Sequence, residues 1–157
     1  MDYIRTMRKY IGHETLFTVG CGAIIENRQG QILLQRRKDR DAWGIPGGVM
    51  ELGETFHETL IREVKEETNL MCRNIRLFGL YSGPTGYSEY PNGDKVYSIQ
   101  IIFHVVEFTG ELIREGSESS DHKFFGRHEL PAALNPTQAP FIMDWAEGRH
   151  LREIIVR

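Results

Sequence analysis

The residues of this sequence best suited to chemistry are glutamates in the segment 47–70, GGVMELGETFHETLIREVKEETNL. At about 100° per residue, an α-helix places the carboxylates of Glu63, Glu66 and Glu67 on one face. That face borders an apolar stripe that includes Val64, so we expect it to be partly shielded from solvent. Like charges at this spacing repel one another, and anions near a helix C-terminus oppose the helix dipole. A hard divalent cation such as Mg²⁺ would offset that repulsion, because it takes oxygen ligands.

For these glutamates alone, an acidic helix face that merely repels is an equally good interpretation. The residues around them add information, because their intervals closely resemble the signature of the Nudix hydrolases. The matching positions are Gly48, then five residues to Glu54, seven to Arg62-Glu63-Val64, one to Glu66-Glu67, and then Thr68, Asn69 and Leu70. Asn69 stands where the family pattern has Gly, and both residue types tolerate the left-handed backbone conformation that ends a helix. The preceding Trp43-x-x-Pro46-Gly47 extends the resemblance.

The resemblance implies a metal-dependent hydrolase that cleaves the pyrophosphate linkage of a nucleoside diphosphate derivative. The substrate class then includes ADP-ribose, nucleotide sugars, dinucleoside polyphosphates and nucleoside triphosphates, and the cofactor is Mg²⁺ or Mn²⁺. Glu54 would lie beside the metal cluster and either support a ligand or share a metal, and Arg62 would orient the carboxylates through charge-assisted hydrogen bonds. The metal ligands that the resemblance implies are the carbonyl oxygen of Gly47 and the carboxylates of Glu63, Glu66 and Glu67.

The general base is less well defined by the sequence. The resemblance implies an additional carboxylate from a loop after a long strand, which here indicates Glu118 or Asp121, with Glu115 as a weaker candidate. We favour Glu118 as the catalytic residue. In other family members a glutamate of the helix serves instead, so Glu66 or Glu67 is the alternative.

Substrate selection lies outside the signature. Pro84 and Tyr87 occupy positions that the family associates with ADP-ribose and with dinucleoside polyphosphates respectively, so they indicate different substrates. Arg36 and Arg37 end a predicted strand near the site, where a guanidinium could bind phosphate, although one of the two is expected to face solvent. We take Arg36 and Tyr87 as the expected substrate contacts.

The elements that must position these residues follow from periodicity and turn signals. Residues 16–25 and 32–34 read as a hairpin around the turn 26–30, whereas 43–48 is rich in Gly and Pro and is expected to be irregular. The excursion 82–94 contains Asn92-Gly93, a hairpin turn signal. Helices are predicted over 54–67 and 140–147, with a short helix or frayed arm over 2–10, and further strands over 75–81, 96–108 and 124–125. This order predicts an α/β fold, a Nudix-type α/β/α sandwich with a mixed β-sheet.

Composition narrows the class of protein. The chain has 157 residues, 40 % hydrophobic and 26 % charged, which fits a single domain over residues 1–157 with 1–14 as an N-terminal arm. Its net charge of −3 makes nucleic acid an unlikely partner. The sequence also lacks a long apolar run and a signal-like start, and its two cysteines are far apart, so we expect a cytoplasmic protein with no membrane association.

The expected partner is therefore a small-molecule nucleotide, and a homodimer is conceivable because many relatives dimerise. The alternative function is a non-catalytic Nudix-fold nucleotide sensor. The intact glutamate set argues against it, because a protein that only binds nucleotide need not keep a repulsive acidic cluster. A hydrolase of RNA ends would need a basic channel, which the net charge does not support.

Overall fold

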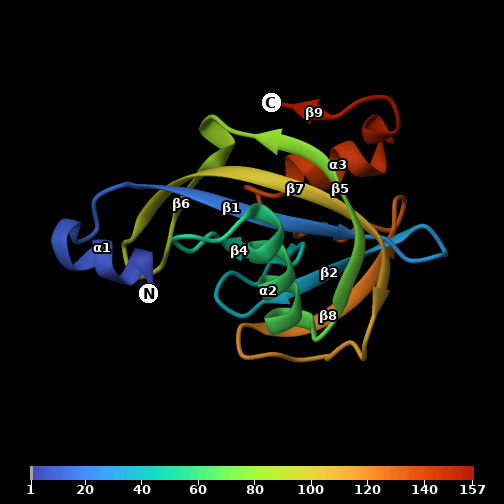
Figure 1. Cartoon of the computed structure of the whole chain (residues 1–157), viewed down its shortest axis with the longest axis horizontal. Helices are drawn as coiled ribbons and strands as arrows, with labels where there is room; N and C mark the ends of the chain where they lie inside the picture. Colours follow the sequence, from blue (N-terminus) through green and yellow to red (C-terminus); the bar gives the residue numbers. More distant parts are fainter. Residues whose placement is uncertain (1) are drawn as a thin grey trace.

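The computed structural model describes residues 2–157, and its strands form two sheets (Figure 1). The strands are β1 (Leu16–Ile25), β2 (Gln31–Arg37), β3 (Trp43–Gly44), β4 (Gly47–Val49), β5 (Met71–Tyr81), β6 (Tyr87–Glu89), β7 (Lys95–Thr109), β8 (Ser119–Gly126) and β9 (Ile155–Val156). The helices are α1 (Tyr3–Ile11), α2 (Phe56–Thr68), η1 (Pro84–Gly86), α3 (Ala139–Ala146) and η2 (Arg149–Leu151). Within this described part, no helix is both long and apolar enough to cross a membrane.

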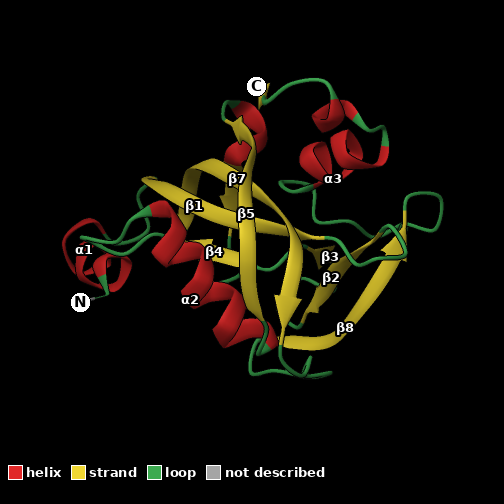
Figure 2. Ribbon diagram, turned by 45° about the vertical axis from the view of Figure 1, so that its right-hand side comes forward, coloured by secondary structure: helices red, strands yellow, loops and turns green. Residues whose placement is uncertain are grey.

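The larger sheet is mixed. Its strands lie in the order β4-β1-β7-β5-β9, with β6 paired to β7. β1 runs parallel to β7, whereas β4, β5 and β6 run antiparallel to their neighbours. The smaller sheet, in the order β3-β2-β8, is antiparallel. Because α2 and α3 lie on opposite sides of the long strands (Figure 2), the predicted α/β class with a mixed sheet is confirmed.

Alternation of side chains along β1 and β7 divides the interior into two cores. The α2-side core consists of Cys21, Ala23, Ile25, Leu33, Leu60, Val64, Leu70, Ile101, Phe103 and Val105. The α3-side core consists of Ile24, Ile32, Leu34, Ile45, Phe78, Tyr81, Ile102, Phe125, Phe141, Ile142, Trp145 and Ile155. Neighbouring residues such as Ile101 and Ile102 therefore belong to different cores, and each face of the sheet is covered by its own helix.

Helix α2 begins two residues later than predicted, because Thr55 caps it. The Thr55 hydroxyl accepts a hydrogen bond from the backbone N–H of Glu58, and the Glu58 carboxylate accepts one from the N–H of Thr55, which together form a capping box. At the other end Asn69 adopts φ = 63°, the left-handed conformation predicted from the sequence. Its amide also donates to the carbonyl of Glu111, which fixes the loop after β7 against the helix end.

Two predictions about strands were wrong. The 16–25 and 32–34 segments do not form an extended hairpin, because β1 and β2 separate after the single bridge from Glu26 to Ile32 and enter different sheets. Ile32, Leu33 and Leu34 are all buried, and β2 takes its hydrogen-bond partners from β3 and β8 instead of from β1. The segment 43–48 is also not irregular, since it contributes the short strands β3 and β4.

Other predicted elements are confirmed with shifted bounds. The 96–108 and 75–81 strands are present as β7 and β5, and the Phe124-Phe125 strand extends to the eight residues of β8. The arm at residues 2–10 forms helix α1, and the closing helix is α3. In the 82–94 excursion, the Gly93 N–H donates to the Tyr90 carbonyl at 2.8 Å, so Asn92-Gly93 makes the turn that joins β6 to β7.

Strand β5 contains an irregularity that determines which face of the sheet its later side chains point to. Leu77 lies opposite Phe103, but Gly79 lies opposite Ile102, so Phe78 is an extra residue in the ladder. Phe78 and Tyr81 are three residues apart and would point to opposite faces of a regular strand. The bulge lets both of them pack in the α3-side core.

The conformation of Asn69 yields the first prediction. Replacement of Asn69 with Gly should leave the midpoint of thermal unfolding close to that of the wild type, because Gly adopts positive φ freely. Replacement with Val should lower stability by about 1–2 kcal/mol, because a β-branched side chain resists that conformation. Thermal denaturation followed by circular dichroism compares the two variants. Equal midpoints for the two variants would contradict the left-handed helix end.

Candidate active site

The backbone of β4 lies directly against α2. A Cβ atom added at Gly48 would collide with the carboxylate of Glu63, and one added at Gly47 would collide with the backbone carbonyl of Cys21. Gly47 also adopts φ = 154°. The absence of side chains at these two positions therefore allows the helix carboxylates and the strand backbone to share one small space.

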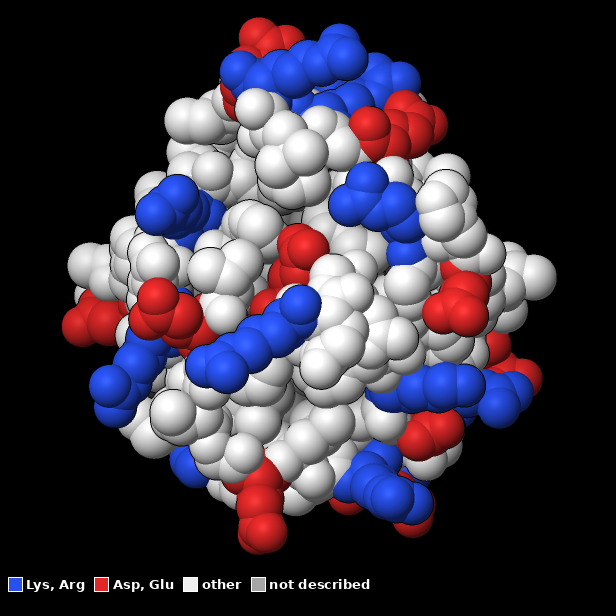
Figure 3. All heavy atoms as spheres, turned by 90° about the vertical axis from the view of Figure 1, so that its right-hand side faces the viewer, with Lys and Arg blue, Asp and Glu red and all other residues white. Residues whose placement is uncertain are grey.

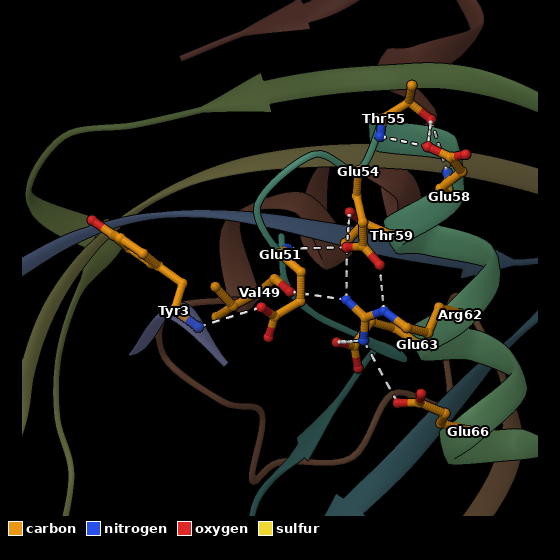
Figure 4. Close-up of polar contacts among 10 residues, drawn as sticks. All are labelled: Tyr3, Val49, Glu51, Glu54, Thr55, Glu58, Thr59, Arg62, Glu63 and Glu66. Atoms are coloured by element: carbon orange, nitrogen blue, oxygen red, sulfur yellow. Dashed lines mark hydrogen bonds and ion pairs between the residues drawn. The ribbon is translucent and has the colours of Figure 1, made fainter. Parts of the chain in front are cut away.

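Arg62 organises the carboxylates on one side of this space (Figure 4). Its Nε and Nη2 atoms donate to the two carboxylate oxygens of Glu54, at 2.6 and 2.9 Å. Its Nη1 atom donates to Oε1 of Glu63 at 2.6 Å and lies 3.6 Å from Oε2 of Glu66. Nη2 also donates to the carbonyl of Val49. One guanidinium thus contacts three of the predicted site carboxylates and the end of β4.

Glu54 is fixed from both sides. Its carboxylate accepts hydrogen bonds from the backbone N–H of Glu51 at 3.0 Å and from the hydroxyl of Thr59 at 2.8 Å, in addition to those from Arg62. The hydrogen bonds from Arg62 are the main reason that the pKa of Glu54 falls to about 2. Glu54 is therefore ionised across the physiological range and holds Arg62 in place.

Glu67 lies on the other side of the space and has a different environment. Oε2 of Glu67 accepts a hydrogen bond of 2.8 Å from the N–H of Gly47. Burial nevertheless raises the pKa of Glu67 to about 7, and burial also raises the pKa of Glu63. Both carboxylates would ionise more readily beside an additional positive charge.

These features fit a hard divalent cation. The donor set is made entirely of oxygen atoms, from the carboxylates of Glu63, Glu66 and Glu67 and the backbone carbonyl of Gly47, which is the class of ligand that Mg²⁺ and Mn²⁺ prefer. Glu66 is 61 % exposed, so one side of the cluster faces solvent and a substrate can approach it. The assignment of these four groups as ligands remains a prediction from the sequence signature.

The three loop carboxylates considered as general base lie in different places. Oε2 of Glu118 lies 3.7 Å from Nη2 of Arg37, and its charge contributes to the raised pKa of Glu63. Glu115 is instead paired with Lys38 at 3.0 Å. Asp121 accepts a hydrogen bond from the backbone N–H of the next residue. Among the three, Glu118 is the carboxylate whose charge acts on Glu63 of the acidic cluster.

A cavity opens beside Gly47 and Gly48. Its lining includes Arg37, Arg40, Ile45, Gly47, Gly48, Ser88, Tyr90, Ser98, Gln100, Asn135, Gln138 and Phe141. The two expected substrate contacts, Arg36 and Tyr87, are absent from this lining. Arg36 pairs with Asp41 at 2.6 Å outside it, and Tyr87 packs against Tyr97. Side chains alternate along β2, so Arg37 rather than Arg36 reaches the cavity.

Sequence reasoning missed Arg40 as a cavity residue. The Arg40 guanidinium carbon lies 4.5 Å from the centroid of the Tyr90 ring, in a cation–π arrangement. The Nη2 atom of Arg40 is buried and has no hydrogen-bond partner among residues 2–157. A buried donor without a partner is unfavourable, so this atom is well placed to meet an acceptor from a bound molecule. Its position in the charged segment 38–42 gave no sign of this.

The distribution of charged side chains over the surface agrees with the low net charge of the chain. On the face shown in Figure 3, the Lys and Arg side chains are interspersed with Asp and Glu side chains rather than gathered by sign. A nucleic-acid surface would instead present a continuous basic patch. This face therefore offers no support for a hydrolase of RNA ends.

The contacts of Arg62 predict a pH-dependent loss of stability on its replacement. Arg62→Met leaves Glu54 and Glu63 without their charged partner, and we expect a loss of about 1–3 kcal/mol near neutral pH. The pKa of Glu54 in the folded protein lies below its ordinary value of 4.5, so this stabilisation is present above about pH 4.5 and disappears as the pH falls towards 2.

The difference in melting temperature between wild type and Arg62→Met should therefore shrink as the pH is lowered from about 6 to about 3. Calorimetry at several pH values measures it. Arg28→Met is a suitable control, because Arg28 is exposed in the turn between β1 and β2. A difference that stays constant with pH would show that Arg62 acts through packing instead of through these carboxylates.

Comparisons with known proteins agree with this geometry. An ADP-ribose pyrophosphatase of Methanocaldococcus jannaschii is 34 % identical over 116 residues, which are 72 % of this chain and 64 % of the archaeal protein. A putative 8-oxo-dGTP diphosphatase of Bacillus subtilis is 29 % identical over 85 % of this chain and 83 % of its own length. A crystal structure of a MutT NUDIX hydrolase from Burkholderia pseudomallei superposes with a TM-score of 0.68 and 26 % identity, over 81 % of this chain and 96 % of that one.

The family itself is shown by a direct match. The family model described as the NUDIX domain matches residues 16–145, from the start of β1 into the last turn of α3. This range contains the two sheets apart from β9, the acidic helix and the cavity. The resemblance found in the signature residues is thus confirmed over most of the chain, and the protein belongs to the NUDIX domain family.

Proposed function

We propose that this protein is a divalent-metal-dependent pyrophosphohydrolase that cleaves a nucleoside diphosphate derivative. The observation that carries the proposal is the junction at Gly47 and Gly48, where the carboxylates of α2 meet a cavity that contains two arginines. NUDIX family members typically depend on a divalent metal. A pyrophosphate is negatively charged, so its binding site must supply positive charge, and the attached nucleoside needs a pocket. A cation held by the carboxylates, together with the two arginines, would supply the charge, and the cavity would accept the nucleoside.

Each part of the junction has a separate task. The carboxylates of Glu63, Glu66 and Glu67 and the carbonyl of Gly47 would hold Mg²⁺ or Mn²⁺, whose charge offsets the repulsion between the pyrophosphate and an incoming nucleophile. Arg62 keeps the Glu63 carboxylate in place through its bond of 2.6 Å. Fixed donors of this kind reduce the reorganisation needed when substrate binds.

A carboxylate of the loop after β7 would accept the proton that the attacking water loses. Hydrolysis adds water across a phosphorus–oxygen bond, so a base must accept one proton from the attacking water. We assign this role to Glu118, since its charge acts on Glu63 of the acidic cluster and its carboxylate is 65 % exposed, within reach of solvent water. Arg37, 3.7 Å from Glu118, would bind a phosphate oxygen and keep the base oriented.

The cavity is suited to the nucleoside part of the substrate. Tyr90 and the guanidinium of Arg40 present flat surfaces on which a base can stack, and the free Nη2 atom of Arg40 can donate to a ribose or phosphate oxygen. The names of the relatives indicate ADP-ribose and 8-oxo-dGTP as the first compounds to test on this chain. Both contain a base, a sugar and a pyrophosphate, which is the order of groups that the cavity and junction would accept.

The cellular context is also part of the proposal. Cys21 is buried and Cys72 half-buried, and both are free thiols, which supports a reducing compartment such as the cytoplasm. A homodimer remains a prediction. Helix α1, the segment suggested for an interface, is held against its own chain by Arg8, which donates to the carbonyl of Lys95 at 2.8 Å. Size-exclusion chromatography with light scattering would decide the oligomeric state.

The activity is tested by product release from a panel of substrates. The panel contains ADP-ribose, a nucleotide sugar, a dinucleoside polyphosphate, dGTP and 8-oxo-dGTP, each with Mg²⁺, with Mn²⁺ and with chelator. We expect metal-dependent cleavage of one class. Glu67→Gln should reduce turnover by on the order of 100-fold or more, since a neutral amide is a much poorer ligand for a hard cation.

A folding control accompanies this variant. Because burial raises the pKa of Glu67, the wild type loses stability as the pH rises from about 4.5 to 7, and Gln does not. In chelator at pH 8, Glu67→Gln should therefore be at least as stable as the wild type. Glu153→Gln, at an exposed position near the C-terminus, should retain full activity. Nucleotide binding without cleavage across the whole panel would instead support the sensor.

Arg40 provides a test of the cavity. Arg40→Gln should raise KM for the preferred substrate by about tenfold and change kcat little, because Arg40 contacts the bound nucleotide and not the bond that breaks. Stability should change little, since the variant removes both a buried donor that lacks a partner in the described structure and the cation–π contact with Tyr90. Arg36→Gln is the matched control and should leave KM unchanged. Steady-state kinetics with equal KM values for the two variants would remove Arg40 from the binding site.

A further inference from the structure

A second cluster of possible metal ligands lies outside the site described above. It consists of Glu26, immediately after β1, His104 in β7 and His150 in η2, and is here named the Glu-His-His cluster. His104 lies two residues beyond Ile102 on β7, so its side chain points to the α3 side of the sheet. The acidic helix α2 covers the other side. The Glu-His-His cluster and the NUDIX site therefore share no residue and lie on different faces of the sheet.

The three side chains converge closely. The Nε2 atom of His104 lies 2.7 Å from Oε2 of Glu26, and the same oxygen accepts a hydrogen bond of 3.0 Å from the indole N–H of Trp145. The rings of His104 and His150 are 5.1 Å apart, centroid to centroid. One ligand atom from each of the three residues lies within 4.8 Å of the other two. Small side-chain rotations would bring three such atoms onto one ion.

The ring of His150 shows that the hydrogen bonding of this cluster is incomplete. Its Nδ1 atom is buried and has no hydrogen-bond partner within residues 2–157. A neutral imidazole has a lone pair on one of its ring nitrogens, which can bind a cation. A buried ring nitrogen without a partner is unfavourable, and coordination to a cation would satisfy it.

The types of donor distinguish this cluster from the NUDIX site. Two imidazoles and one carboxylate are ligands that suit Zn²⁺ and neighbouring transition metals, whereas the NUDIX site offers only oxygen atoms. The hydrogen bond from Trp145 orients the Glu26 carboxylate, as partners of metal ligands commonly do. A surface hollow lined by Phe78, His104, His150 and Leu151 gives access from solvent and room for a water ligand.

We infer that Glu26, His104 and His150 form a binding site for a Zn²⁺-class transition metal, separate from the NUDIX site. The ion would join the β1–β2 turn, the middle of β7 and the segment after α3, which are distant in sequence. It would therefore stabilise the C-terminal part of the chain, including β9. The guanidinium of Arg127, 5.8 Å from the Trp145 ring centroid, adds positive charge nearby, which should weaken cation binding.

The test uses the whole chain with its metals removed and with excess Mg²⁺ present. Co²⁺ is then titrated as a spectroscopic probe, followed by displacement with Zn²⁺ and by calorimetry with Zn²⁺. We expect one equivalent of Co²⁺ to bind with the visible absorption of a nitrogen-ligated ion, to quench the fluorescence of Trp145, and to leave when Zn²⁺ is added. Bound Zn²⁺ should also raise the midpoint of thermal unfolding.

Variants separate the possible outcomes. His150→Ala and Glu26→Gln should each weaken Zn²⁺ binding by about tenfold or more, as should the more conservative His150→Gln. His128→Ala, which removes an exposed histidine, should bind as the wild type does. Glu67→Gln should also retain the absorption band, because it alters only the NUDIX site. The inference is overturned if Co²⁺ gives no band, or if the band and the affinity for Zn²⁺ are the same in His150→Ala as in the wild type.

Discussion

The acidic cluster of this fold depends on one guanidinium. Four glutamates on and beside α2 would repel one another if they were left alone, and the helix dipole adds to the cost at the C-terminal end. Arg62 offsets part of this repulsion by binding two carboxylates at 2.6 Å each and by reaching a third. Its bond to the carbonyl of Val49 also fixes α2 relative to β4. The same interaction therefore positions the proposed ligands and joins the elements that carry them.

Arg62 does not offset the charge of Glu67, which lies on the opposite side of the cluster from this guanidinium. This carboxylate is buried beside the N–H of Gly47 and has no arginine bonded to it in the described structure. The protein thus stabilises the carboxylates that frame the site and leaves a buried one whose charge an incoming cation can balance. This distribution of charge lowers the stability of the folded protein in the absence of a cation. It is seen in the contrast between the lowered pKa of Glu54 and the raised pKa of Glu67.

The sequence predicted those parts of the structure that depend on local patterns. Helix α2, its end at Asn69 and the convergence of Glu54, Arg62 and Glu63 follow from spacing along a single segment. The cavity was not predictable in the same way, because Arg40 and Tyr90 come from two loops that meet only when β6 pairs with β7. The separation of β1 from β2 depends on distant partners, β7 and β8. Which of Arg36 and Arg37 faces the cavity depends on the register of β2 with its neighbouring strand, and the sequence alone does not define that register.

The bulge in β5 makes that strand intolerant of changes in length. Deletion of Phe78 would remove the extra residue together with a large buried side chain, whereas deletion of Leu80 would place Tyr81 opposite Ile101, on the α2 side of the sheet. Tyr81 would then leave the α3-side core, and its hydroxyl would lose the buried hydrogen bond of 2.8 Å to Asp144. The loop 110–118, by contrast, connects β7 to β8 at the surface, and the part of it between Glu111 and Glu118 can absorb insertions. Homologues of this chain should therefore vary in length between β7 and β8, while β5 keeps the same number of residues between α2 and Tyr81.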